Sequence, residues 1–342
     1  MYRQLPLLTH FIKEGHRVMV FAYGSSLAYL KSNFADTLNL EIAEVTVPYY
    51  WGGPQGLDFW RSAANAPLTD GSVNMKAMAQ AWDWLGKPDL VLSDYEPVSA
   101  QYAYAKNAKL ITLDQQSKYL LDGYHSQLGG TTYLDEVERL RMFFPKAALR
   151  VACSFFKVPS SSEEVVLVAP IIRESVKNMR RSPKQGHYVV YLTAQSGFTQ
   201  SADEMLVELG KSKGVFEVFL PKSTVTGQIP ENVNRHDHGS PLFDRCLKEC
   251  EGLISTAGHS LLSEAMHLGI PVLALPLPLY EQQLNAHILA ENRFGMSSPT
   301  FDTKKFNQFK ENTAEFTRNI AADLKVLLRG DGLATVQNLL GI

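Results

Sequence analysis

Short apolar runs alternate with stretches of helical periodicity along most of this chain. Leu90 to Leu92 and Val272 to Leu275 are two such runs, whereas Met75, Met78 and Trp82 share one face of a helix. Strands that alternate with helices build βα units, whose strands pair in parallel. Helices then cover both faces of an open sheet. The alternation therefore predicts an α/β protein with doubly wound, Rossmann-like sheets.

The length of the chain predicts more than one domain. It has 342 residues, and domains average about 100–200. The stretch from Pro170 to Gly186 is rich in Lys and Arg and contains Pro183, which is typical of a connection. We expect a first domain over 1–170, a linker over 171–186 and a second domain over 187–315, the two domains facing a cleft. The helical end, 316–342, is expected to pack back on the first domain.

Charge and cysteine content narrow the partners and the compartment. The 33 Lys and Arg residues nearly balance 35 acidic residues, which argues against duplex nucleic acid as a partner. Three cysteines do not form a disulfide framework, and no apolar run has the ~18 residues of a membrane span. We expect a cytoplasmic protein. Peripheral contact with the inner membrane face is one role for the aromatic stretch from Tyr49 to Trp60; an acceptor site or an ordinary core are the others.

The loop that follows Leu253 and Ile254 is the richest candidate for ligand binding. It consists of small residues, and the helix after it carries Ser260 and Glu264 on one face. Small residues let a backbone approach a ligand, and the free N–H groups of a helix start favour a phosphate. A carboxylate at Glu264 suits a vicinal diol such as a ribose. The alternative is that Glu264 is a solvated surface residue and Ser260 a helix cap.

The next βα unit adds polar groups at a second helix start. Glu281 and Gln282 open the helix after the strand Val272 to Leu275. An acid and an amide at this position can hydrogen-bond several hydroxyl groups of a sugar. Capping is the alternative for Glu281, because an acid in the first turn also stabilises the helix dipole.

Together the two units resemble the donor-binding motif of GT-B nucleotide-sugar glycosyltransferases, which include UDP-glycosyltransferases and MurG-like enzymes. The resemblance rests on the spacing Gly258…Glu264-Ala265…Gly269-x-Pro271…Pro276…Glu281-Gln282…Asn285. It implies a UDP-sugar donor, a diphosphate at the turn, ribose hydroxyls on Glu264, and the donor hexose on Glu281 and Gln282. The turn consists of Thr256, Ala257, Gly258, His259 and Ser260; many UDP-glycosyltransferases have a histidine where this chain has Thr256.

Three further features of the second domain bear on donor or metal binding. Gln195 and Ser196 follow the first strand of the second domain, where GT-B proteins often present a loop to the donor phosphates. His236 stands where the family holds the nucleobase. The segment His236-Asp237-His238 with Cys246 and Cys250 is a conceivable zinc site, but the spacing fits no standard pattern. We therefore expect no metal and no cofactor other than the nucleotide sugar as substrate.

Acidic residues that follow strands of the first domain are candidates for a catalytic base. The segments Leu92 to Pro97, Ile111 to Gln116 and Val168 to Arg173 resemble a prokaryotic branch of glycosyltransferases close to MurG. A carboxylate at the end of a strand could deprotonate an acceptor hydroxyl, particularly if burial raises its pKa. The candidates are Asp94, Glu96 and Asp114. The alternative for Asp94 or Glu96 is a cap on the helix that begins at Pro97.

These features predict a glycosyltransferase that moves a hexose from a UDP-sugar to a hydroxyl acceptor. The acceptor could be a glycan, a lipid-linked compound or a small molecule. A UDP-N-acetylglucosamine 2-epimerase-like enzyme is an alternative with the same fold. A nucleotide-sugar-binding protein without catalysis is an alternative of a different class.

The start of the chain differs from the pattern that the resemblance implies. The related enzymes begin with a strand and a glycine-rich loop that usually holds a histidine, whereas Leu5 to Ile12 is already helical and Arg17 to Ala22 is the first strand. We expect that about 15–20 residues, a strand and its loop, are lacking. The alternative is that another segment fills the gap. A strand Arg17–Ala22 that pairs directly with Leu90–Leu92 would contradict the first expectation.

Overall fold

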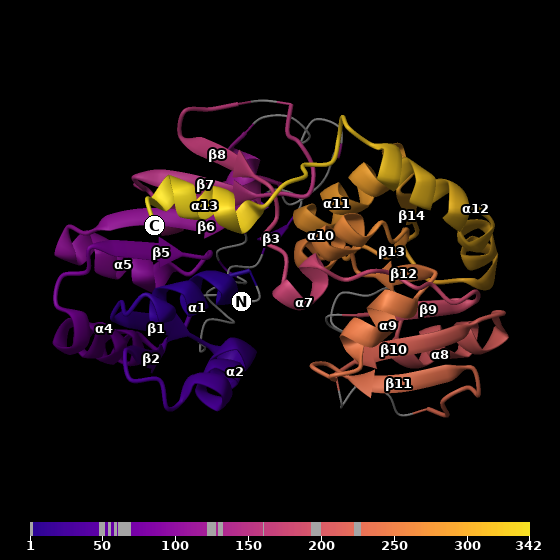
Figure 1. Ribbon diagram of the computed structural model, residues 1–342, viewed down its shortest axis with the longest axis horizontal. Helices are drawn as coiled ribbons and strands as arrows, with labels where there is room; N and C mark the ends of the chain where they lie inside the picture. The colour runs from indigo at the N-terminus through magenta and orange to yellow at the C-terminus, as the bar shows by residue number, and fades with distance from the viewer. Residues whose placement is uncertain are drawn as a thin grey trace. The chain divides into compact units, whose positions relative to one another are not determined.

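The computed structural model describes residues 3–47, 52–53, 56–57, 60, 70–121, 128, 133–159, 161–192, 200–221 and 227–342. The chain forms two compact units. Unit 1 consists of Met1–Cys153, Val158–Ile171 and Asp331–Ile342, and unit 2 of Ser154–Lys157 and Ile172–Gly330. Both contain parallel sheets with helices, so the predicted fold class is confirmed (Figure 1).

Unit 2 is built on one unbroken parallel sheet of six strands in the order β11-β10-β9-β12-β13-β14. The strands are β9 (His187–Tyr191), β10 (Val215–Leu220), β11 (Val233–Asp237), β12 (Gly252–Ser255), β13 (Val272–Ala274) and β14 (Gly295–Ser297). Every neighbouring pair runs in parallel. The strands predicted from the apolar runs at 253–254 and 272–275 correspond to β12 and β13.

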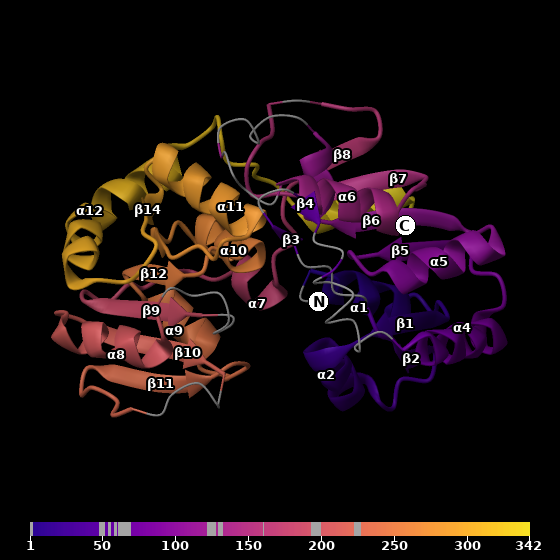
Figure 2. The same cartoon turned by 180° about the vertical axis from the view of Figure 1, so that it is seen from behind.

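Helices cover both faces of this sheet. They are α7 (Glu174–Lys177), α8 (Ala202–Lys211), α9 (Phe243–Glu249), α10 (His259–Leu268), α11 (Tyr280–Glu291) and α12 (Thr303–Ala322). α9 faces the viewer in Figure 1 and α8 in Figure 2, in agreement with the alternation of side chains along a strand. Val190 faces the core beneath α8, whereas Tyr191 contacts Phe243 of α9.

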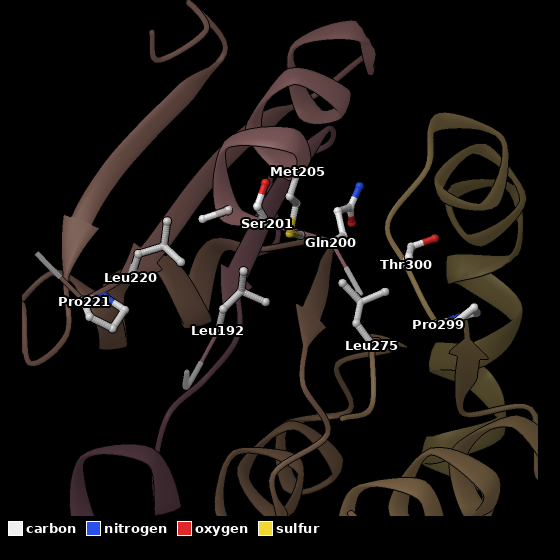
Figure 3. Close-up of a pocket in the computed structure, with 10 residues that line it drawn as sticks. Leu192, Gln200, Ser201, Met205, Leu220, Pro221, Leu275, Pro299 and Thr300 are labelled. Carbon is white, nitrogen blue, oxygen red and sulfur yellow. The ribbon is translucent and has the colours of Figure 1, made fainter. Parts of the chain in front are cut away.

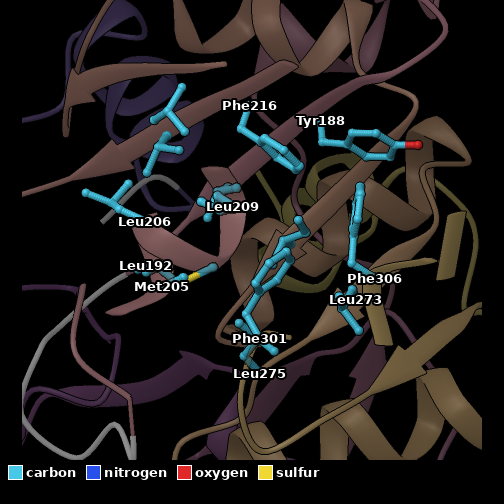
Figure 4. Close-up of a cluster of buried hydrophobic side chains, with 14 of the residues drawn as sticks. Tyr188, Leu192, Met205, Leu206, Leu209, Phe216, Leu273, Leu275, Phe301 and Phe306 are labelled. Atoms are coloured by element: carbon cyan, nitrogen blue, oxygen red, sulfur yellow. The ribbon is translucent and has the colours of Figure 1, made fainter. Parts of the chain in front are cut away.

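The main core of unit 2 is aromatic. Tyr188, Phe216 and Phe306 are fully buried and contact one another with ring centroids 4.8–5.8 Å apart (Figure 4). Phe306 comes from α12, which also adds Phe309 and Phe316 to this core. Burying such rings contributes a large share of the apolar area removed from water.

Unit 1 contains shorter sheets. Its elements are α1 (Leu5–Lys13), β1 (Val18–Ala22), α2 (Gly24–Phe34), β2 (Leu40–Glu44), β3 (Gly52–Gly53), β4 (Gly56–Leu57), α4 (Gly71–Leu85), β5 (Leu90–Ser93), α5 (Pro97–Lys106), β6 (Lys109–Asp114), the 3-10 helix η1 (Gln116–Leu120), α6 (Tyr133–Phe143), β7 (Leu149–Cys153), β8 (Val165–Val168) and α13 (Gly332–Leu340). β1 pairs only with β2 among the described strands, while β5, β6, β7 and β8 form a separate four-stranded sheet.

Among the described residues β1 and β5 belong to different sheets. The direct pairing of Arg17–Ala22 with Leu90–Leu92, which would contradict the expectation of a lacking strand, is thus not found there. Helices connect the two parts instead. Leu7 of α1 packs into the core of the four-stranded sheet, and the next residue, Leu8, packs against β1 and β2.

The boundaries of the units differ from the predicted domains at Ser154–Lys157, at the linker and at the C-terminus. Residues 172–186 belong to unit 2, where Arg181 donates to the carbonyl oxygens of Gly269 and Cys250 at 2.8 and 2.7 Å. Of the segment 316–342, which was predicted to pack back, only Asp331–Ile342 lies in unit 1. The residues before it belong to unit 2, because the phenylalanines of α12 pack in the core of that unit. No helix within the described ranges has the length and apolar character needed to cross a membrane.

Candidate functional site

The loops that follow β12 and β13 begin at one edge of the sheet of unit 2. β9, β12 and β13 are neighbours and run in parallel, so their carboxyl ends lie at the same edge. Ligands of open parallel sheets bind outside this edge. The loops that follow β12 and β13 carry the predicted donor-binding residues, and the structure therefore brings these two groups together.

The turn between β12 and α10 is held from both sides. Ala257 is fully buried and has a φ of +61°, a left-handed conformation that a residue with a Cβ rarely adopts. Its N–H donates to Ser255 Oγ at 3.1 Å, and its carbonyl accepts a bond from Asn285 Nδ2 at 2.8 Å. Thr256 is buried beside it, and Gly258 is the N-cap of α10. The backbone of the predicted diphosphate turn is thus preformed.

Glu281 and Gln282 reach back to the loops of this edge. A carboxylate oxygen of Glu281 accepts a bond from the N–H of His259, the first residue of α10, at 3.0 Å. Gln282 Oε1 accepts a bond from the N–H of Leu277 at 2.9 Å. Glu281 does lie in the first turn of α11, as the capping alternative requires, but its bond goes to the neighbouring helix. The carboxylate of Glu281 therefore lies at the start of α10, where the free N–H groups of a helix bind anions.

Glu264 is buried on α10 and paired with an arginine. Arg173 donates from Nε and Nη2 to the two carboxylate oxygens at 2.6 and 2.8 Å, and its Nη1 lies 2.8 Å from Asp244 Oδ1. Glu264 is therefore not a solvated surface residue, whereas Ser260 is exposed. Sequence reasoning missed the roles of Arg173 and Asp244; the only signal was the position of Arg173 at the end of the Val168 to Arg173 segment.

The remaining donor candidates are His236, Gln195 and Ser196. His236 stacks on Phe219, and its Nε2 lies 2.5 Å from Glu217 Oε2. Cys246 joins these two groups within 4.8 Å, and this is the only grouping of possible metal ligands in the described part of the chain. It differs from the grouping considered from the sequence, because Cys250 is buried and donates to the carbonyl oxygen of Leu247. Gln195 and Ser196 lie outside the described residues.

Among the candidate bases of unit 1, Asp94 and Glu96 have strong local partners. Arg3 binds both oxygens of Asp94 at 2.7 and 3.0 Å. Burial alone would raise the pKa of Asp94, but the charge and hydrogen bonds of Arg3 bring it below its ordinary value. Glu96 is the N-cap of α5 and accepts bonds from the N–H groups of Val98 and Ser99 at 2.5 and 2.8 Å. Burial raises the pKa of Glu96 despite these bonds. The capping alternative thus describes Glu96.

Asp114 combines full burial with a raised pKa. Its oxygens accept bonds from the N–H and the hydroxyl of Ser117 at 2.6 and 3.0 Å. Burial, with a smaller contribution from the charge of Asp94, raises the pKa of Asp114 to about 6, although the bonds from Ser117 and the charge of Arg3 act in the opposite direction. A carboxyl with a pKa near neutrality can both accept and release a proton at working pH.

A cavity of about 270 Å³ lies at the same edge of the sheet of unit 2 (Figure 3). Apolar side chains make up much of its wall: Leu192 and Leu275 follow β9 and β13, Leu220 is the last residue of β10, and Met205 comes from α8. Gln200, Ser201 and Thr300 are its polar members. None of the predicted donor-binding residues that the structure describes lines it. The described residues of its wall carry no charged side chain.

Comparisons with known proteins agree with this architecture. A protein of Methanopyrus kandleri named uncharacterized glycosyltransferase MK0977 is 27% identical over 158 residues, 42% of this chain and 45% of that protein. The UDP-N-acetylglucosamine–N-acetylmuramyl-(pentapeptide) pyrophosphoryl-undecaprenol N-acetylglucosamine transferase of Rickettsia felis is 23% identical over 193 residues, 48% of this chain and 53% of that enzyme. The chain thus matches about half the length of these curated relatives.

Solved structures extend the likeness over the whole chain. A UDP-glucose:anthocyanidin 3-O-glucosyltransferase, solved in complex with UDP, matches with a TM-score of 0.64 at 12% identity, covering 99% of this chain and 95% of that one. At this identity the match supports the GT-B fold alone, and this expectation is confirmed. The family model described as glycosyl transferase family 1 matches residues 2–313. The chain belongs to glycosyl transferase family 1.

Proposed function

We propose that this protein transfers a hexose from a UDP-sugar to a hydroxyl group of an acceptor. Membership of glycosyl transferase family 1 supports the class of reaction. The observation that carries the donor assignment is Glu264, a buried carboxylate on the helix that follows the preformed turn after β12. Its two oxygens can accept bonds from the two hydroxyl groups of a ribose.

The proposed reaction is a direct displacement at the anomeric carbon. The bond from this carbon to the acceptor oxygen forms as its bond to the diphosphate breaks, and UDP leaves. The N–H groups at the start of α10, from Gly258 to Ser260, would stabilise the negative charge on the leaving diphosphate. Glu281 would contact the hexose, and its bond to His259 N–H would be exchanged for bonds to the donor.

The acceptor proton would pass to a carboxylate of unit 1. Burial raises the pKa of Asp114 to about 6, whereas Arg3 lowers the pKa of Asp94 and the N–H groups at the start of α5 engage the carboxylate of Glu96. We therefore place Asp114 first as general base. Asp114→Asn should then lower the turnover number more than it raises the Michaelis constant.

The central test is binding of UDP and release of UDP from a panel of UDP-sugars. Glu264→Gln should weaken UDP binding by about 1.5–3 kcal/mol, because charge-assisted bonds to hydroxyl groups are lost. Glu315→Gln is a matched control, since Glu315 lies on α12 and pairs with Arg293 at the surface. Equal UDP affinity of Glu264→Gln and the control would remove Glu264 from the donor site. An interconverted sugar without any acceptor would indicate an epimerase instead.

Contact with a membrane surface is a separate proposal. Of the aromatic stretch that suggested it, Trp60 is 88% exposed, and Tyr49, Tyr50, Trp51 and Phe59 lie outside the described residues. Exposed tryptophan favours the interface between lipid and water. Flotation with anionic vesicles should carry the wild-type protein and less of Trp60→Ala; equal flotation of both would contradict this role.

A further inference from the structure

The contact between Arg173 and Glu264 uses both oxygens of the carboxylate. Nε and Nη2 of the guanidinium donate to Oε1 and Oε2 at 2.6 and 2.8 Å. A guanidinium and a carboxylate joined by two such bonds meet edge to edge. The edge of Glu264 from which both oxygens can be reached together is therefore occupied by Arg173.

A ribose would need this same edge. Its two neighbouring hydroxyl groups are also a pair of donors, and they can reach both oxygens together only from the side that Arg173 occupies. Glu264 is 8% exposed, so the rest of its surface offers little room for a sugar. The contact with Arg173 and a bidentate contact with a diol thus exclude each other.

Asp244 offers the guanidinium a second place. Its Oδ1 lies 2.8 Å from Arg173 Nη1, yet this buried oxygen accepts no directed hydrogen bond within the described part of the chain. The contact is therefore an ion pair, and Asp244 Oδ1 can still accept a directed hydrogen bond from the guanidinium. The ring of Phe243, the residue before Asp244, lies 5.9 Å from Arg173 Cζ and adds an aromatic neighbour for the cation.

The backbone around Arg173 is anchored while its side chain has these two partners. Arg173 is the N-cap of α7, and His267 of α10 lies with its Nε2 3.0 Å from the carbonyl oxygen of Lys177 at the end of α7. This bond links α7 to the helix that carries Glu264. Because the guanidinium already contacts Asp244, release of Glu264 requires rotation of one side chain rather than movement of a helix.

Building on the proposed function, we propose that Arg173 is a latch on the ribose-binding carboxylate and that Asp244 holds its guanidinium when the latch opens. Arg173 would thus determine specificity, because only ligands that bind Glu264 through ribose hydroxyls have to open it. A ligand without these hydroxyls would leave the ion pair closed. Removing the arginine and removing its second partner should therefore change UDP affinity in opposite directions.

The test measures the dissociation constants of UDP and 2′,3′-dideoxyuridine diphosphate by calorimetry. Arg173→Met should bind UDP on the order of tenfold more tightly than the wild type, and Asp244→Asn should bind it several-fold more weakly. Neither variant should change the affinity for the dideoxy compound. In the double variant the effect of Asp244→Asn should vanish, since no guanidinium remains to be held. Arg173→Lys, which cannot form the two-bond contact, should lie between the wild type and Arg173→Met.

The ratio of the two affinities is measured within each variant, so a general loss of folding would move both and leave the ratio unchanged. One outcome is that Glu264→Gln weakens UDP binding while Arg173→Met leaves it unchanged or weakens it. This outcome would overturn the latch but not the proposed donor site. If neither the wild type nor Arg173→Met binds UDP, the donor site itself is wrong, and the latch with it.

Discussion

The sheets of the two units differ at their centres. In unit 2, β9 and β12 pair with each other and with a further strand on their outer sides, and β12 is buried along its whole length. In unit 1, the described parallel strands form two separate sheets, so there is a break in the ladder: β1 pairs with β2 alone, and β5 is an edge strand of the four-stranded sheet. Four of the five residues of β1 and three of the four of β5 are only half-buried. β6 and β7, away from the break, are mostly buried.

This difference shows that helices can hold a unit together where the ladder does not. α1 contributes Leu7 to one core and Leu8 to the other, and Val98 of α5 packs in a cluster with Ala43 and Val45 around β2. Apolar burial is not directional, so helices can span a break that hydrogen bonds cannot. We expect the region at the break to be less cooperative than the core of unit 2.

Two matched Phe→Ala variants should show the largest contrast. Phe306→Ala removes a fully buried ring from the core of unit 2 and should cost about 4 kcal/mol. Phe21→Ala removes a half-buried ring of β1 at the break and should cost about 2 kcal/mol. All four tryptophans lie in unit 1, so fluorescence during urea unfolding reports on that unit, while circular dichroism reports on both. Equal costs for the two variants would break the comparison.

The dependence of stability on pH should distinguish the units next. The pKa of Asp114 is about 6 in the folded protein against 3.8 as the ordinary value. Between pH 4 and 6 the unfolded chain loses this proton while the folded state keeps it, so unit 1 should lose about 3 kcal/mol as the pH rises. Asp114→Asn should remove this contribution and leave that of Glu96, whose pKa burial also raises, whereas Asp83→Asn, an exposed control on α4, should leave both.

Unit 2 should not show that loss. The carboxyl groups of unit 2 with a resolved shift, Glu204, Glu208 and Glu249, have lowered pKa values, which acts in the opposite direction. If the fluorescence of unit 1 reports constant stability over pH 4–6, the environment assigned to Asp114 is wrong.

Ion pairs should give a smaller contrast. Arg3 and Asp94 are 15% and 18% exposed, and Arg3→Met leaves a partly buried carboxylate without its cation; we expect a cost of about 2 kcal/mol. Arg293→Met in unit 2 breaks a pair with Glu315 whose side chains are 61% and 33% exposed, and should cost about 0.5 kcal/mol or less. A larger effect for Arg293→Met would show that the ion pair between Arg3 and Asp94 contributes little to unit 1.

The smallest effect should come from chelation. Within the described residues, a grouping of metal ligands occurs in unit 2 and not in unit 1. We expect EDTA to leave donor turnover and the stability of both units unchanged, because the start of α10 can carry the leaving anion. Loss of turnover or of unit 2 stability upon chelation, restored by Zn²⁺, would instead assign a metal to Glu217, His236 and Cys246.

Two strands that the sequence analysis did not predict, β7 and β11, show the limits of prediction from local hydrophobic patterns. β11 contains one apolar residue, Val233, because it is an edge strand with little of its surface buried. β7 contains Arg150, a buried residue whose guanidinium donates to the carbonyl oxygen of Phe144. A charged residue inside an apolar run hides the strand, since its partner is known only once the chain has folded.

Local features of the sequence determined the order of most strands and helices and the position of the turn between β12 and α10. The apolar run of β12, the small residues after it and the spacing to Glu264 are all contained within about a dozen residues, so periodicity and turn chemistry suffice to predict them. The tertiary structure alone decided which groups meet. Arg173 binds Glu264 across 91 residues, Glu281 reaches the start of α10 across 22, and β1 pairs with β2 but not with β5. Such contacts depend on how elements pack rather than on the residues within them, and no local pattern records them.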